Sequence, residues 1–353
     1  MVAAESSGST TAAAGERSLA FVLGPGRSGT STMAGALFHS GYHVPKAIKG
    51  NETNPVGFFE PRWVVNFHRR LVRSVGLRPL DQDPEAMRRL EGVLGDQKIR
   101  DELHDWLARR LERNGRLVIK DPRMVWFRDL WVDAATRLDV DPRFVIMLRH
   151  PSEVSSSRSQ FYNSDQVAAV AGWINVALMT ERLTAGSPRA LVHYPQLTAD
   201  WRTELTRLRD DLGLILDPPP EQRPHPVDEF IDPSLRRRKQ SWTESSVPVH
   251  LQDLGDRTFE ALRRLAEEGD SPEIAETLDA LRVDYARMYS DAMALVRPSF
   301  RRAREDTARK VRQQTLAAAA RKAAAAQPPP GLASLPRRVV RRLRSSAPGS
   351  VNR

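Results

Sequence analysis

The sequence contains no cysteine. This absence excludes disulfide bonds and thiolate metal sites, and it is compatible with a reducing compartment. No apolar run approaches the roughly 20 residues that a helix needs to span a bilayer. Residues 1–17 have neither a basic start nor an apolar core. We therefore expect a disordered N-terminus here and not a secretory signal.

The net charge of +10 is compatible with nucleic-acid binding, but its distribution argues against that class. Most of the excess Lys and Arg lies in residues 301–353, and residues 1–300 are close to neutral. A basic groove across the main domain is therefore not expected. We predict no nucleic-acid partner.

A glycine-rich segment, residues 24–31, follows one apolar run and precedes a helical pattern. Strand, glycine loop and helix together form an anion cradle, because backbone N–H groups point at the bound group. Gly24 and Gly29 have the spacing of a Walker loop, but Thr30 stands where a nucleoside triphosphatase has lysine. Arg27 lies inside the loop instead. The segment predicts a phosphate-binding loop that does not hydrolyse ATP or GTP; the alternative is a glycine turn without a ligand.

Short apolar runs alternate with helical patterns along the first two thirds of the chain, at residues 19–23, 117–119, 144–148 and 191–194. Continuous apolar runs are typical of parallel strands buried on both faces. We predict an α/β fold with a P-loop NTPase-like parallel sheet flanked by helices, and a ligand beyond the carboxyl ends of the strands. The expected organisation is a disordered segment 1–17, an α/β domain 18–250, a helical C-terminal extension 251–315, and an Ala/Pro linker with a basic tail 316–353.

Arg149 ends the third apolar run, and Ser157 lies on the first turns of the helix that follows. A guanidinium, a hydroxyl and a helix N-terminus together favour a bound phosphate. Ser155 and Arg158 are candidate helpers. The alternative is a capped helix with a surface arginine.

The second apolar run ends in Lys120-Asp121-Pro122-Arg123. A lysine beside a reaction centre can neutralise charge that develops on a leaving phosphate. Asp121 and Arg123 can pair and orient it. The alternative is an ordinary salt bridge at a strand end.

The loop Arg27-Ser28-Gly29-Thr30-Ser31 resembles the 5′-phosphosulfate loop of sulfotransferases. Arg149 and Ser157 have the separation found in the 3′-phosphate motif of that family. Residues 54–60 resemble a segment of its bacterial members, and residues 120–122 resemble a segment of its tyrosylprotein-sulfating and bacterial carbohydrate-sulfating members. The resemblance covers about residues 18–245. It implies the donor 3′-phosphoadenosine 5′-phosphosulfate without a metal ion, held by Gly26, Arg27, Ser28, Gly29, Thr30, Ser31, Arg149 and Ser157.

The same resemblance implies transfer of a sulfuryl group to a hydroxyl of a glycan, glycolipid or small metabolite. Arg27 and Lys120 would stabilise the leaving group, and Glu60 would act as general base. His68 is the rival base, and Glu60 as a helix N-terminal acid is the structural alternative. Two other classes stay open: an atypical P-loop small-molecule kinase and a catalytically silent nucleotide-binding module.

Two basic segments lie late in the chain. Residues 235–239 are expected to be a solvated charge run, and the alternative is a contribution to the 3′-phosphate site. In the tail, Leu335, Val339 and Leu343 lie among arginines, which is the pattern of a helix on an anionic membrane. A disordered basic end is the alternative. We expect a cytoplasmic protein, with this tail as the candidate for peripheral contact at the inner membrane face.

Overall fold

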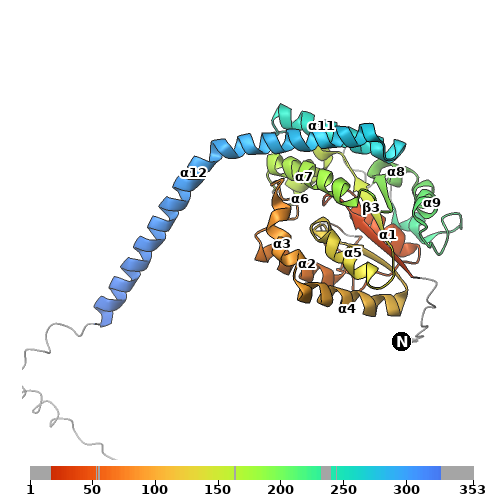
Figure 1. Ribbon diagram of the computed structural model, residues 1–353, viewed down its shortest axis with the longest axis horizontal. Coiled ribbons are helices and arrows are strands. Elements are labelled where there is room, and N and C mark those ends of the chain that lie inside the picture. Colours follow the sequence, from red (N-terminus) through yellow and green to blue (C-terminus); the bar gives the residue numbers. More distant parts are fainter. Residues whose placement is uncertain are drawn as a thin grey trace, which may run out of the picture. The chain divides into compact units, whose positions relative to one another are not determined.

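The computed structural model describes residues 17–52, 54, 56–162, 164–231, 240–243 and 245–326 (Figure 1). Three of the predicted segments lie outside these residues: the N-terminal residues 1–16, the basic run 235–239 and the tail beyond 326. What the sequence predicts for them stays a prediction. The chain divides into two units, Met1–Tyr289 and Ser290–Arg353.

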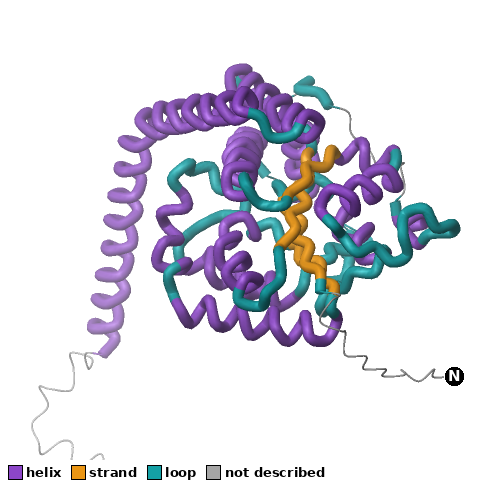
Figure 2. Tube along the Cα trace, turned by 45° about the vertical axis from the view of Figure 1, so that its right-hand side comes forward, coloured by secondary structure: helices purple, strands orange, loops and turns teal. Residues whose placement is uncertain are grey.

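One parallel sheet forms the centre of the first unit, with the strand order β2-β1-β3-β4. Its strands are β1 (Ser18–Leu23), β2 (Arg116–Lys120), β3 (Pro142–Leu148) and β4 (Arg189–His193). β1 is central: Phe21 pairs with Ile119 on one side and with Phe144 on the other. Figure 2 shows the strands enclosed by helices. Burial on both faces explains the continuous apolar runs, and the predicted parallel α/β sheet is confirmed.

The helices cover the sheet as two apolar layers. On one face α1 (Thr30–His39), α8 (Tyr194–Ala199), α9 (Trp201–Leu212) and α10 (Pro226–Phe230) share a core. The other face is covered by α2 (Arg62–Ser74), α4 (Gln97–Asn114), α5 (Arg128–Thr136), α6 (Pro151–Tyr162), α7 (Gln166–Thr184) and α11 (Val249–Glu268). Short connecting helices are α3 (Glu91–Leu94) and the 3₁₀ segments Ala86–Leu90 and Met124–Phe127.

The helices after residue 248 begin as part of the same core. Leu254 and Phe259 of α11, and Ile274 and Leu281 of α12 (Pro272–Ala326), are buried with the residues of α7. An amphipathic helix needs such a partner for its apolar stripe. The first unit therefore includes these helices up to Tyr289.

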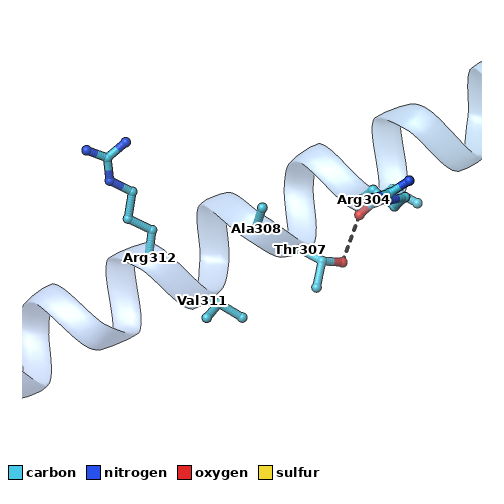
Figure 3. Close-up of a pocket in the computed structure, with 6 residues that line it drawn as sticks. Arg304, Thr307, Ala308, Val311 and Arg312 are labelled. Atoms are coloured by element: carbon cyan, nitrogen blue, oxygen red, sulfur yellow. Dashed lines mark hydrogen bonds between the residues drawn. The ribbon is translucent and has the colours of Figure 1, made fainter. Parts of the chain in front are cut away.

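The second unit contains the rest of α12, from Ser290 to Ala326. Its side chains are mostly exposed, and it continues through residues 316–326, where the sequence predicts a linker. Alanine has the highest helix propensity, which explains why the alanine-rich residues 316–326 are helical. Figure 3 shows one stretch of this helix, in which the Thr307 hydroxyl donates to the Ala303 carbonyl at 2.7 Å. None of the helices that the structure describes combines the length and the apolar character needed to cross a bilayer.

Candidate functional site

A cavity of about 650 Å³ lies at the carboxyl ends of the strands. Each strand leads into it: Gly26 follows β1, Lys120 ends β2, Arg149 follows β3 and Tyr194 follows β4. This is the edge where parallel α/β sheets bind ligands. Cations outnumber carboxylates in the lining, which has Arg27, Arg69, Lys120, Arg123, Arg149 and Arg158 against Glu52 and Glu60. The cavity therefore suits a polyanion.

The predicted phosphate loop joins β1 to α1. Gly29 has φ 90 and precedes the first helical residue, and no side chain caps this helix end. The first backbone N–H groups of α1 are therefore available to an anion. Thr30 and Ser31 line the cavity, but the side chain of Ser28 is fully buried. Ser28 is therefore placed to contribute to the predicted binding loop through its backbone.

Tyr194 is a site residue that the sequence analysis missed. A Cβ atom at Gly29 would overlap its ring, so only glycine fits there. The ring also lies 4.6 Å from the guanidinium carbon of Arg149. Tyr194 thus packs between the phosphate loop and the arginine that follows β3. No sequence motif indicates this contact, because Tyr194 and Gly29 meet only through the strand order.

Arg27 and Ser157, which are distant in sequence, meet directly. Arg27 Nε donates to Ser157 Oγ at 3.0 Å. Arg149 Nη1 donates to the Arg27 carbonyl at 3.3 Å, and Arg149 Nε binds Glu153 Oε2 at 2.8 Å. Glu153 is buried, so it holds the Arg149 guanidinium in place at the cavity wall. The structure thus brings together the two segments that the sequence predicts to bind phosphate.

Arg158 adds a third guanidinium to this cluster. It lines the cavity, and its Nε is buried without a hydrogen-bond partner among the described residues. Burial lowers the pKa of Arg158, and the neighbouring charge of Arg27 lowers it further. A bound anion would offset both effects. Ser155 is not among the lining residues, and its hydroxyl donates to the Ser152 carbonyl inside α6.

Glu60 and Lys120 form a buried ion pair in the same cavity. Lys120 Nζ lies 2.6 Å from Glu60 Oε1 and also donates to Ser31 Oγ at 3.2 Å. Glu60 follows Phe59, whose φ of 51 is rare for a bulky residue. The Phe59 ring packs on Phe230 of α10, with 5.4 Å between the centroids. This packing holds Phe59 in the strained conformation and directs Glu60 toward Lys120.

His68 does not line the cavity. It is fully buried: its Nε2 accepts from Trp131 Nε1 at 2.9 Å, and its Nδ1 lies 3.2 Å from Asp121 Oδ1. Burial lowers the pKa of His68, so the ring is neutral with its proton on Nδ1. Burial alone would raise the pKa of Asp121, but hydrogen bonding to His68 and the charge of Arg123 hold it below its usual value. His68 therefore supports Asp121 and Arg123 and is not placed to act as a base.

This buried pair predicts a pH effect on stability. Because the folded pKa of His68 lies below 6.5, the unfolded chain binds more protons as the pH falls below that value, and the free energy of unfolding decreases. Glutamine can accept from Trp131 and donate to Asp121 without titrating. We expect His68→Gln to lose less stability than the wild type between pH 7 and pH 5, measured by urea unfolding. Equal losses in both proteins would contradict the neutral assignment.

Comparison with solved structures finds similarity to sulfotransferases. One similar structure is the sulfotransferase domain of the Synechococcus PCC 7002 olefin synthase (19% identity, 72% of this chain and 98% of that chain covered, TM-score 0.42). A second is the sulfotransferase domain of the curacin biosynthetic pathway (16% identity, 70% of this chain and 98% of that chain covered, TM-score 0.43). A third is a Mycobacterium tuberculosis H37Rv sulfotransferase (15% identity, 68% of this chain and 76% of that chain covered, TM-score 0.35). No family model and no curated protein matches the chain.

Proposed function

We propose that this protein is a sulfotransferase that uses 3′-phosphoadenosine 5′-phosphosulfate as donor and a hydroxyl group as acceptor. The contact between Arg27 and Ser157 is the observation that supports it most directly. It joins the loop suited to the 5′-phosphosulfate to the helix suited to the 3′-phosphate. The donor carries anionic groups at both ends, and three guanidiniums from Arg27, Arg149 and Arg158 converge on this part of the cavity.

In the proposed reaction the acceptor oxygen forms a bond to sulfur while the bond from sulfur to the bridging phosphate oxygen breaks. Glu60 accepts the proton of the acceptor hydroxyl. Protonation removes the charge that holds Lys120, so its ammonium becomes available to the oxygen of the leaving phosphate. Arg27 would stabilise the same developing charge. The Glu60–Lys120 pair thereby couples proton removal to leaving-group stabilisation.

A small-molecule kinase is the competing function. It requires a lysine after Gly29 and a carboxylate that holds Mg²⁺ beside the phosphates. Thr30 occupies the lysine position, and Glu60 is already paired with Lys120. Incubation with sulfur-35-labelled donor and cell extract tests the proposal, with the labelled product identified by mass spectrometry. A labelled acceptor supports it, whereas Mg²⁺-dependent ATP turnover without sulfur transfer would favour the kinase.

Donor binding gives a second prediction. Arg149→Ala should weaken binding of 3′-phosphoadenosine 5′-phosphate by roughly 2–4 kcal/mol, because a charge-assisted contact is lost in a partly desolvated cavity. Isothermal titration with and without EDTA measures the affinity, which we expect to be insensitive to the chelator. Since Arg149→Ala also leaves Glu153 buried and unpaired, the double variant Arg149→Ala/Glu153→Gln controls for misfolding.

The comparison ligand is adenosine 5′-phosphate, which lacks the 3′-phosphate. Equal affinity of the wild type for both nucleotides would contradict the assignment of Arg149 and Ser157. Arg109 is an exposed arginine on α4 outside the cavity lining. The variant Arg109→Ala is the matched control and should bind 3′-phosphoadenosine 5′-phosphate like the wild type.

A further inference from the structure

One exposed face of α2 carries a row of arginines. Arg62, Arg69 and Arg73 lie at intervals of seven and four residues, so they share one side of the helix, with Asn66 between them. All four side chains are exposed, while the opposite side of α2 packs into the core. From Arg62 to Arg73 the helix rises by about 16 Å. We call these four residues the α2 row.

The arginines of the α2 row have no acidic partner among the described residues. Two other residues of α2 have acidic neighbours. Arg70, on the flank of the row, pairs with Glu102 of α4, and His68 faces Asp121 on the buried side. The charge beside the row is thus neutralised, and the row itself stays cationic. An unpaired row of this kind attracts a polyanion.

The α2 row is continuous with the proposed active site. Arg69 lines the cavity, and Arg62 follows Glu60 by two residues. A chain bound along the row could therefore place one of its groups beside Glu60. Glu52 also lines the cavity, and it belongs to the loop before Glu60 and not to the row.

We propose that the acceptor is an acidic glycan, with uronic-acid carboxylates bound by Arg62, Arg69 and Arg73 and one hydroxyl presented to Glu60. This inference depends on the proposed sulfotransferase function and names its acceptor class. Guanidinium groups bind carboxylates in a forked geometry, and the Asn66 amide can hydrogen-bond a sugar hydroxyl.

The α2 row fits a linear polyanion better than an acidic protein. A specific protein interface buries about 800 Å² on each partner around an apolar centre with aromatic anchors. α2 exposes no large apolar side chain. A single row of cations with a polar amide instead matches a chain whose charges are spaced along one line.

The test uses a galacturonic acid hexamer as the acidic probe, a neutral glucose hexamer of equal length, and a glutamate decamer, each titrated into the full-length protein at low salt. We expect only the acidic glycan to bind appreciably. Arg62→Gln/Arg69→Gln/Arg73→Gln should weaken its binding at least tenfold, because each exposed ion pair contributes modestly and three are removed. Arg109→Gln removes one exposed charge from α4 and should change binding less than twofold.

The outcomes separate the two proposals. Failure of the acidic hexamer to bind, or unchanged binding in the triple variant, overturns the acceptor assignment. Equal binding of the glutamate decamer also overturns it, in favour of an acidic protein partner. Binding of 3′-phosphoadenosine 5′-phosphate is measured on the wild type and on Arg62→Gln/Arg73→Gln, which leaves the cavity lining intact, and should be nearly unchanged in this double variant. If the wild type does not bind this nucleotide, the sulfotransferase proposal fails whatever the glycan result.

Discussion

Replacing Glu60 by glutamine is expected to slow sulfuryl transfer about a hundredfold or more. A general base contributes roughly that factor, and glutamine cannot accept the proton of the acceptor hydroxyl. The amide oxygen can still accept from Lys120, so the contact now 2.6 Å long has a neutral replacement. Binding of 3′-phosphoadenosine 5′-phosphate should be unchanged or tighter, because the variant removes a negative charge from an anion site. Single-turnover kinetics with labelled donor and nucleotide titration measure the two effects separately.

The control for this variant is Glu52→Gln, which removes the other carboxylate of the cavity lining. It should leave the rate within a few-fold of the wild type. Full activity in Glu60→Gln would show that another group is the base. Lost nucleotide binding in Glu60→Gln would instead assign Glu60 a structural role.

A substitution of Lys120 is expected to affect folding as well as catalysis. Its removal leaves Glu60 as an unpaired charge in a buried position, which typically costs 3–5 kcal/mol. A Lys120 variant therefore confounds catalysis with folding. This is why the glutamine variant of Glu60, and not a lysine variant, is the direct test of the pair.

The sheet could be predicted from sequence because its signal is local. Each strand is a continuous apolar run, and burial on both faces requires this composition in β1 and β3 alike. The glycine-rich loop between β1 and α1 could be predicted for the same reason, since its glycines and Arg27 are adjacent in the chain, and its binding of phosphate stays a prediction. The position of Arg149 at a strand end followed from the alternation of strands and helices.

What could not be predicted depends on contacts between distant segments. The packing of Tyr194 against Gly29 arises from the strand order β2-β1-β3-β4, which no local pattern specifies. The pairing of Glu60 with Lys120 requires the left-handed conformation of Phe59, and a phenylalanine gives no sign of it. His68 looked like an available base because sequence alone does not show that Trp131 donates to its Nε2 and that Asp121 lies 3.2 Å from its Nδ1.

Arg27 is the residue whose loss should reduce catalysis most. Its guanidinium lies where the two segments predicted to bind phosphate meet, with Nε 3.0 Å from Ser157 Oγ. Removing one preorganised donor to a developing negative charge typically costs a hundredfold to a thousandfold in turnover. We expect Arg27→Gly to lower the rate of sulfuryl transfer by roughly that factor. Arg27→Lys should recover part of the rate, because it restores the charge without the forked geometry.

Glycine is the informative replacement because of the backbone. Arg27 has φ 80, a region that side chains disfavour and that glycine adopts without strain. If Arg27 served only to shape the loop, Arg27→Gly would keep the loop conformation and with it the activity. A catalytic role predicts that the thermal midpoint of Arg27→Gly is equal to or above that of the wild type, while its rate of sulfuryl transfer is strongly reduced. Differential scanning fluorimetry and single-turnover kinetics on the same preparation distinguish the two, and retained turnover would exclude Arg27 from the reaction.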